Sequence, residues 1–186
     1  MRYTQEIGTI IKKTETARGV FDVTLNSPII AKAAAAGQFV DVLCNGFPLR
    51  RPISLCGFDS KNETIRLVFE VRGRGTEWLS KLQTGESMDI IGPLGHGFSM
   101  TDASRKAVIV GGGIGTPPLL PIAWFYGENA TVITGFRSAS AAVLQNDFLD
   151  AGAKTILCTD DGSAGFHGLT TQALERHLEE NQCDIL

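Results

Sequence analysis

Four glycines fall within five residues after a short apolar run, in Val108-Ile-Val-Gly-Gly-Gly-Ile-Gly-Thr116. A backbone without Cβ atoms lets a diphosphate approach more closely than other residues permit. Pro117 and Pro118 follow, as prolines do in the first turn of a helix, whose N-terminus carries unpaired N–H groups and a partial positive charge. A strand, a glycine-rich turn without side chains and a helix, in this order, predict dinucleotide binding. The alternative is a turn that only reverses the chain.

Two further stretches offer groups for an anion and an aromatic ring. Arg50-Arg-Pro-Ile-Ser-Leu55 places a guanidinium and a hydroxyl at one end of a predicted strand. The planar guanidinium suits a diphosphate, and a serine hydroxyl can bond a nitrogen or carbonyl of a flavin ring. Val71-Arg-Gly-Arg-Gly-Thr-Glu77 has an open backbone before a predicted helix, which is a second place for an anion. Each stretch alone could be a surface arginine or a capped helix start; together they favour a ligand with a diphosphate and an aromatic ring system.

The loop at residues 159–168 follows a third predicted strand, at the sheet edge where open α/β proteins bind ligands. Asp160 or Asp161 could accept hydrogen bonds from ribose or carboxamide groups. Alternatively, the Asp and Gly residues could serve only to form a turn. Arg137, which ends the second strand, could bind a 2′-phosphate or stack on adenine. These residues leave the choice between NADH and NADPH open.

Metal sites and nucleophile constellations are not predicted. The chain has three histidines and four cysteines, which are His96, His167, His177, Cys44, Cys56, Cys158 and Cys183. No C-x-x-C pair occurs, so the spacing supports neither a disulfide framework nor a zinc or iron–sulfur site. We expect free, mostly buried thiols and structural or surface histidines.

The composition narrows the class of protein. The 186 residues are 43% apolar and 20% charged, as in ordinary soluble globular proteins. The formal net charge of −3 argues against nucleic-acid binding. No apolar run reaches the roughly 18 to 20 residues that span a bilayer, and the first residues have no signal-peptide core. We therefore expect a cytoplasmic protein that binds neither nucleic acid nor membrane.

The first half of the chain has a β pattern. Alternating apolar residues and turn signals predict six short strands, at residues 6–12, 20–26, 39–44, 53–59, 64–71 and 87–91. Six short strands in about ninety residues indicate a small closed barrel. One predicted helix interrupts it at residues 76–82, with Thr76 as N-cap and with Trp78, Leu79 and Leu82 facing inward.

The second half alternates strands and helices, which predicts a doubly wound parallel sheet. Strands are expected at 106–110, 131–135 and 155–159, and helices from the proline turn to about 126, within 139–151, and at 169–180. Residues 183–186 look like the start of a fourth strand, so the chain looks cut. We place one domain at residues 1–100 and a second, incomplete at its C-terminus, at residues 101–186.

Five motifs in this order resemble those of the ferredoxin reductase superfamily. They are Arg51-Pro-Ile-Ser54, Gly73-Arg-Gly-Thr76, Gly92-Pro-Leu-Gly-His-Gly97, Gly111-Gly-Gly-Ile-Gly115 and Asp160-Asp-Gly-Ser163. Within the superfamily the chain is most similar to the electron-transfer subunits of class B dihydroorotate dehydrogenase, which act in pyrimidine biosynthesis. The resemblance implies a Greek-key β-barrel that binds FAD and an α/β domain that binds NADH. It also implies a two-iron two-sulfur cluster and a partner subunit that carries FMN.

The resemblance also assigns roles to residues. Arg51, Pro52, Ile53 and Ser54 would hold the flavin, with Ser54 beside the reactive N5; Val68, Phe69 and Glu70 would line its ribityl side, and Gly75 and Thr76 its pyrophosphate. The NADH site would comprise Gly111, Gly112, Gly113, Gly115 and Thr116, together with Asp160 and Asp161. No side-chain acid or base is needed to transfer a hydride between two bound cofactors.

The sequence departs from the family at its C-terminus. The family continues beyond this point with a cysteine-rich segment, and none of the four cysteines matches the cluster ligands. We therefore predict no cluster and no other metal in this polypeptide. Two alternatives remain open: a stand-alone NAD(P)H:flavin oxidoreductase, and a truncated, non-catalytic FAD-binding module.

Overall fold

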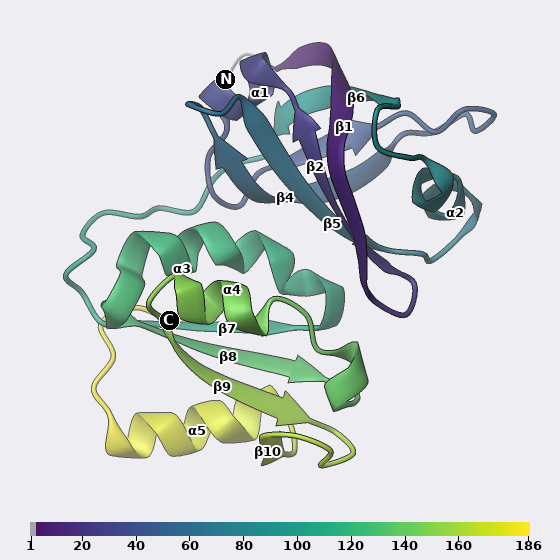
Figure 1. The fold of residues 1–186 in the computed structure, drawn as a ribbon. Helices are drawn as coiled ribbons and strands as arrows, with labels where there is room; N and C mark the ends of the chain where they lie inside the picture. The colour runs from purple at the N-terminus through teal and green to yellow at the C-terminus, as the bar shows by residue number, and fades with distance from the viewer. Residues whose placement is uncertain (1–2) are drawn as a thin grey trace. The chain divides into compact units, whose positions relative to one another are not determined.

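A computed structural model describes residues 3–186 (Figure 1). The chain divides into two compact units, of which the first ends at Phe98 and the second runs from Ser99 to Leu186. Each unit has its own hydrophobic core. The predicted fold class, an antiparallel barrel followed by a parallel sheet with helices, is confirmed.

The first unit is a closed barrel of six antiparallel strands in the order β1-β2-β5-β4-β3-β6. The strands are β1 (Thr4–Ala17), β2 (Val20–Asn26), β3 (Phe39–Val42), β4 (Arg51–Asp59), β5 (Thr64–Glu70) and β6 (Ser87–Leu94). Strand β1 pairs with β2 along one side and with β6 along the other, which closes the barrel and leaves no free edge. The inward residues of β5, Ile65, Leu67 and Phe69, join the barrel core as the alternation predicts.

A short helix, α1 (Pro28–Ala33), lies between β2 and β3 and was not predicted. Glu6 of β1 caps the first amides of this helix. Its carboxylate accepts hydrogen bonds from the amides of Ile29 and Ile30, both at 3.1 Å. The Ser27 hydroxyl donates to the same carboxylate. Such a cap depends on the pairing of distant segments, so it leaves no local signature in the sequence.

Helix α2 (Arg74–Lys81) begins two residues earlier than predicted, and Thr76 is not its N-cap. The Thr76 hydroxyl instead accepts hydrogen bonds from the amides of Arg72 (2.9 Å) and Gly73 (3.2 Å), which closes the turn before the helix. At the other end, the Lys13 ammonium donates to the carbonyls of Ser80 and Leu82. Residues 78, 79 and 82 face the barrel core as predicted.

The second unit is a parallel sheet in the order β10-β9-β8-β7, with α3 and α4 on one face and α5 on the other (Figure 1). Its strands are β7 (Ala107–Gly112), β8 (Ala130–Phe136), β9 (Lys154–Thr159) and the two-residue β10 (Phe166–His167). Its helices are α3 (Leu120–Tyr126), α4 (Gln145–Asp150) and α5 (Thr170–Glu180). Ile185, which lies in the segment predicted to start a fourth strand, bridges Ala107 in parallel, on the side of β7 away from β8.

The segment after β7 differs from the long helix that was predicted. It forms two 3₁₀ turns, Gly113–Gly115 and Pro117–Leu119, and only then the seven-residue α3. Pro121 has no amide hydrogen, so its i→i−4 bond to the carbonyl of residue 117 cannot form, whereas Pro117 and Pro118 stand in the first turn, where amides have no partner within the helix. The turn therefore exposes backbone groups that no side chain covers, but it does not lead directly into a long helix.

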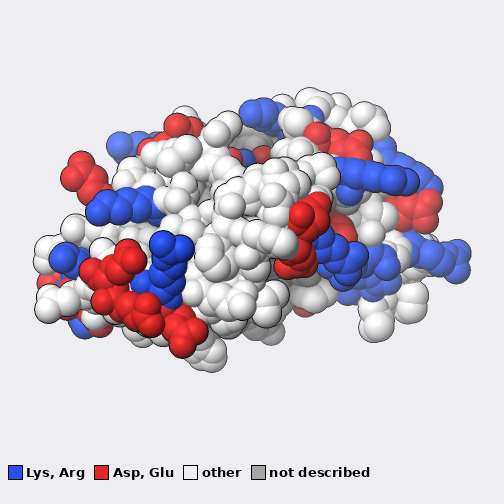
Figure 2. All heavy atoms as spheres, turned by 90° about the horizontal axis from the view of Figure 1, so that it is seen from below, with Lys and Arg blue, Asp and Glu red and all other residues white. Residues whose placement is uncertain are grey.

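The surface carries both signs of charge. On the face of the described residues drawn in Figure 2, Lys and Arg side chains lie next to Asp and Glu side chains, and uncharged atoms separate these groups. Neither sign covers that face. No helix among residues 3–186 is long and apolar enough to cross a membrane.

Candidate functional site

Arg51 is a cation without a carboxylate partner at the start of β4. Its Nη1 donates to the carbonyls of Leu49 (2.7 Å) and Arg50 (3.3 Å), and among residues 3–186 it forms no ion pair. The neighbouring Arg50, in contrast, binds the Asp89 carboxylate at 2.9 Å. A half-buried guanidinium that keeps free donors favours an anion from outside the chain.

The guanidinium of Arg51 lies directly against the backbone of Gly75. A Cβ at Gly75 would stand 2.9 Å from the Arg51 Cζ and 3.0 Å from its Nη2, and would overlap Nε. Any larger residue here would require the Arg51 side chain to move away from the backbone. The first intrahelical bond of α2 runs from the Glu77 amide to the Gly73 carbonyl at 2.9 Å, and no side chain caps the helix. The amides of Arg74, Gly75 and Thr76 are thus open to an anion beside the guanidinium.

Ser54 and Val68 lie together on the outer face of the barrel. Leu55 pairs with Leu67 and both are buried in the barrel core, so the residues next to them on β4 and β5 point outward. Among the described residues the Ser54 hydroxyl has no hydrogen-bond partner in the chain. Val68 is nevertheless only 3% exposed, so the group on this face that a ligand would meet is the Ser54 hydroxyl.

The other predicted flavin residues contribute less through their side chains. Ile53 and Phe69 point into the barrel core, so they position the neighbouring backbone instead of facing a ligand. Pro52 is exposed and pairs with Asp41 of β3. The Glu70 carboxylate forms an ion pair with the Arg72 guanidinium, which is largely exposed. The Thr76 hydroxyl is used in the turn described above, which leaves its amide as the group for an anion.

In the second unit, a hollow of about 310 Å³ lies at the carboxyl ends of the parallel strands. This is the edge where open α/β sheets bind ligands. Its lining is mostly backbone and small side chains, with one positive and one negative residue. The lining residues are Gly112, Gly113, Gly135, Phe136, Arg137, Asp160, Gly168, Leu169 and Thr170.

The glycines of the turn have different roles. A Cβ at Gly111 would overlap the side chain of Leu119, so this glycine lets the strand and the following turns pack together. A Cβ at Gly113 or Gly115 would meet nothing within 4 Å, and Gly113 has a φ of +51°. Thr116 is fully buried, and its hydroxyl has no hydrogen-bond partner among the described residues.

The two predicted aspartates are used differently. Asp160 lines the hollow, whereas the Asp161 carboxylate accepts hydrogen bonds from the amide (2.9 Å) and the hydroxyl (2.5 Å) of Ser163. The same hydroxyl accepts a bond from the Ala139 amide at 2.7 Å. Asp161 therefore holds the loop against the segment after β8, and of the two aspartates only Asp160 lines the hollow.

The Ser163 bonds lower the pKa of Asp161 below its ordinary value, the side-chain bond contributing most. We expect Ser163→Ala to raise this pKa back toward that of a free aspartate. Because the folded-state pKa is depressed, the loop is stabilised above the ordinary aspartate pKa and loses this stabilisation as the pH falls through the lowered value. An NMR titration of the carboxyl carbon checks this; an unchanged pKa in the variant would show that the hydroxyl bond is not its cause.

Gly165 is the most restricted glycine of this loop. It has a φ of +63°, and a Cβ there would overlap the Leu157 carbonyl oxygen and stand 2.9 Å from its carbon. We expect Gly165→Ala to lower the free energy of unfolding of this unit by about 2–4 kcal/mol, through backbone strain plus displacement of the loop. Gly152→Ala is the control, because Gly152 has a φ of +83° but only contacts of 3.6 Å or more. If chemical denaturation gives the same loss of unfolding free energy for both variants, the clash with the Leu157 carbonyl does not contribute to the effect.

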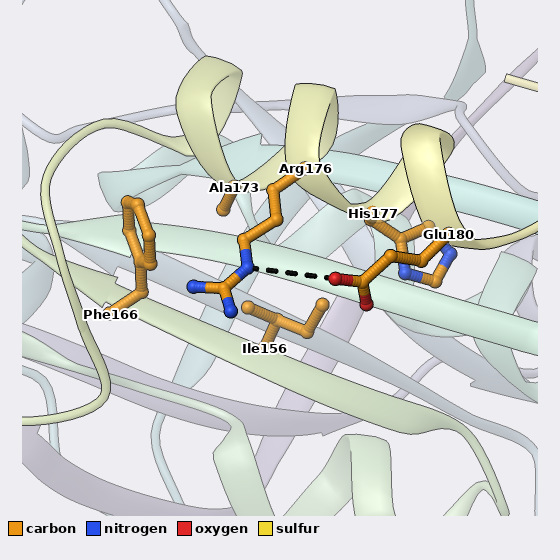
Figure 3. Close-up of a pocket in the computed structure, with 6 residues that line it drawn as sticks. All are labelled: Ile156, Phe166, Ala173, Arg176, His177 and Glu180. Carbon is orange, nitrogen blue, oxygen red and sulfur yellow. Dashed lines mark ion pairs between the residues drawn. The ribbon is translucent and has the colours of Figure 1, made fainter.

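A second hollow, of about 220 Å³, lies beside α5 and contains none of the predicted residues. Figure 3 shows Arg176 and Glu180 reaching from α5 over Ile156, with Phe166 at one side. The two charged groups are 3.9 Å apart and both are largely exposed, so their pairing contributes little. The hollow brings together no groups arranged for chemistry.

The cysteines are free, and three of the four are buried, as expected. Desolvation raises the pKa of both Cys44 and Cys158, and the nearby Arg51 charge offsets part of this rise at Cys44. The thiols are therefore neutral and poor nucleophiles. Within residues 3–186, no group of three or more His, Cys, Asp or Glu side chains is placed to hold a metal ion.

No protein-family model matches the chain. The dihydroorotate dehydrogenase B (NAD(+)) electron transfer subunit of Enterococcus faecalis (strain ATCC 700802 / V583) is 36% identical over 98% of the chain, which spans 72% of that relative. The corresponding subunit of Geobacillus thermodenitrificans (strain NG80-2) is 35% identical over 90% of the chain, which spans 68% of it.

Solved structures share the fold. An NADH-dependent reduced ferredoxin–NADP oxidoreductase matches with a TM-score of 0.84 and 30% identity, over 94% of this chain and 64% of that one. The cytochrome P450 reductase of Amycolatopsis has a TM-score of 0.82 at 21% identity, over 97% of this chain and 60% of that one, a likeness of fold alone. Given its identity to the curated subunits along nearly its whole length, the chain belongs to the family of dihydroorotate dehydrogenase B electron-transfer subunits.

Proposed function

We propose that this chain is a flavoprotein electron-transfer subunit that binds FAD on its barrel and NADH at the sheet of its second unit. The observation that carries the proposal is the unpaired Arg51 guanidinium, packed against the bare backbone of Gly75 at the start of α2. Together they form a cradle of the charge and size of a diphosphate. The names of the relatives, which are NAD(+)-linked electron-transfer subunits, support the same function.

The barrel residues would bind and orient the flavin. Arg51 and the open amides of Gly75 and Thr76 bind the diphosphate, while Ser54 offers its hydroxyl to a polar edge of the ring. Val68 is only 3% exposed, so it would line the ribityl side of the flavin through its backbone instead of its side chain. When bound, FAD supplies a ring that accepts two electrons from a nicotinamide and releases them one at a time. The chain therefore contributes alignment and electrostatics instead of an acid or base.

The second unit would bind the dinucleotide at its hollow. The backbone at Gly112 and Gly113 faces the diphosphate, and Gly115 leaves the adjoining turn open. Asp160 accepts hydrogen bonds from ribose hydroxyls. Arg137 lies in the same hollow and stacks on the adenine or meets a 2′-phosphate, so it sets the preference between NADH and NADPH.

The electrons would pass to a separate catalytic subunit. The relatives are named as electron transfer subunits of dihydroorotate dehydrogenase B, and these names support a separate subunit for the oxidation of dihydroorotate. We propose that this partner carries FMN and that the two chains form a hetero-oligomer in pyrimidine biosynthesis.

FAD retention tests whether the flavin is a resident cofactor. The protein is loaded with FAD and passed through a desalting column, and the flavin absorbance of the protein fraction is measured. Near-stoichiometric FAD supports the proposal. If all the flavin separates from the protein but the protein still oxidises NADH when free flavin is added, the chain is a flavin reductase that uses flavin as a substrate.

A further inference from the structure

Phe47 lies under two arginines that come from different segments. The Arg51 guanidinium carbon is 5.8 Å from the centre of the Phe47 ring, and that of Arg74 is 5.4 Å from it. These are distances at which the face of an aromatic ring attracts a cation. Phe47 packs against the barrel core, so its ring is a fixed surface for both guanidinium groups.

Neither guanidinium is paired with a carboxylate among the described residues; the pKa of Glu77 is lowered mainly by its bond to Lys81 and least by the Arg74 charge. Among residues 3–186, Arg51 and Arg74 form no ion pair, whereas Arg50 and Arg72 each bind a carboxylate. The carboxylate nearest to Arg74 in the sequence, Glu77, accepts a bond from Lys81 at 2.8 Å. Two positive groups held on one ring repel each other unless an anion comes between them.

We propose that Phe47 positions Arg51 and Arg74 as a two-cation clamp for a diphosphate, with Arg74 as a ligand additional to the predicted set. The inference rests on the proposed FAD site, because the clamp faces the backbone of Gly75 that Arg51 already contacts. Phe47 acts only through the arginines. A diphosphate carries a negative charge on each phosphorus, so two separate cations match it better than one.

The test is the dissociation constant of FAD, measured by the change in flavin fluorescence on binding. We expect Arg74→Met to raise it about tenfold, as for the loss of one charge-assisted hydrogen bond. Phe47→Leu, which keeps the apolar packing, should raise it about fivefold, as for weakened cation–π contacts. The inhibition constant of inorganic diphosphate against FAD binding should also rise in both variants. The control is Lys61→Met, which removes one positive charge from the turn between β4 and β5, at the other end of β5 from α2; it should bind FAD as the unmodified protein does.

Two further measurements separate the clamp from a general effect on the fold. Riboflavin has the ring but no phosphate, so its affinity should be the same in all variants. In the Arg74→Met background, Phe47→Leu should have a smaller effect than alone, because one of its two cations is gone. Unchanged FAD affinity in Arg74→Met, or equal losses for riboflavin and FAD, would overturn the clamp. Absence of FAD binding in the unmodified protein would instead refute the proposed function.

Discussion

Replacing Arg51 with methionine is expected to weaken FAD binding about 100-fold while the barrel stays folded. The guanidinium lies against the Gly75 backbone, and it has no carboxylate partner among the described residues. Its removal takes away two or more charge-assisted hydrogen bonds to a diphosphate at once. Within the chain, the substitution removes only two hydrogen bonds to loop carbonyls and the cation–π contact with Phe47. The stability of the barrel should therefore change little.

Arg50→Met is the matched control, because the neighbouring arginine has the opposite role. Arg50 binds the Asp89 carboxylate at 2.9 Å and the Asp89 carbonyl at 3.1 Å. Its loss should lower the free energy of unfolding by about 1–2 kcal/mol and leave FAD affinity within about twofold. Isothermal titration with FAD and chemical denaturation measure both quantities. If both variants bind FAD equally well, Arg51 does not hold the diphosphate.

Replacing Gly112 with valine is expected to weaken NADH binding about 100-fold or more and to leave FAD binding unchanged. Gly112 lines the hollow and has extended backbone angles, φ −145° and ψ 143°, that suit a β-branched residue. A Cβ there would meet only the Gly135 carbonyl oxygen, at 3.5 Å, which is an ordinary contact. The valine side chain would therefore occupy the place where the dinucleotide approaches the backbone, without straining the fold.

The measurement is the NADH dependence of flavin reduction, followed in rapid-mixing experiments, with thermal denaturation of the same samples. The melting temperature should stay within a few degrees of that of the unmodified protein. Retained NADH affinity would place the dinucleotide away from this turn. A large fall in melting temperature would instead show that Gly112 is needed for packing.

The strands were predictable because their patterns and ends are local. Strand β2 is bounded by turn residues on both sides, and the structure reproduces its predicted bounds, residues 20–26. Helix α1 was not predicted because its cap, Glu6, is distant in the sequence and lies beside the helix only in the folded barrel. The helix predicted from the proline turn to about residue 126 ends as predicted, but its first part is a 3₁₀ turn and the α-helix begins only at Leu120, because Pro121 cannot donate the bond that would join the two parts.

The residues of the site were predictable by type, but not always by role. Charge and glycine spacing indicated Arg51 and Gly75, yet only the folded chain brings the guanidinium against that backbone. Asp160 and Asp161 are indistinguishable in the sequence, and hydrogen bonds within the loop separate a residue that lines the hollow from one that holds the loop. Arg74 lies within the Gly73–Thr76 motif but was assigned no role, and Phe47 belongs to no motif; their proximity appears only when β3, β4 and α2 are assembled.

The central claim is that one chain holds FAD and accepts electrons from NADH through it. The most direct measurement is anaerobic rapid mixing of the FAD-loaded protein with excess NADH, following the visible absorption band of the flavin. We predict that the band bleaches, that the rate saturates with NADH, and that Gly112→Val needs far higher NADH for the same rate. A protein that retains FAD but whose band stays unchanged at saturating NADH would contradict the account and leave a flavin-binding module without electron transfer.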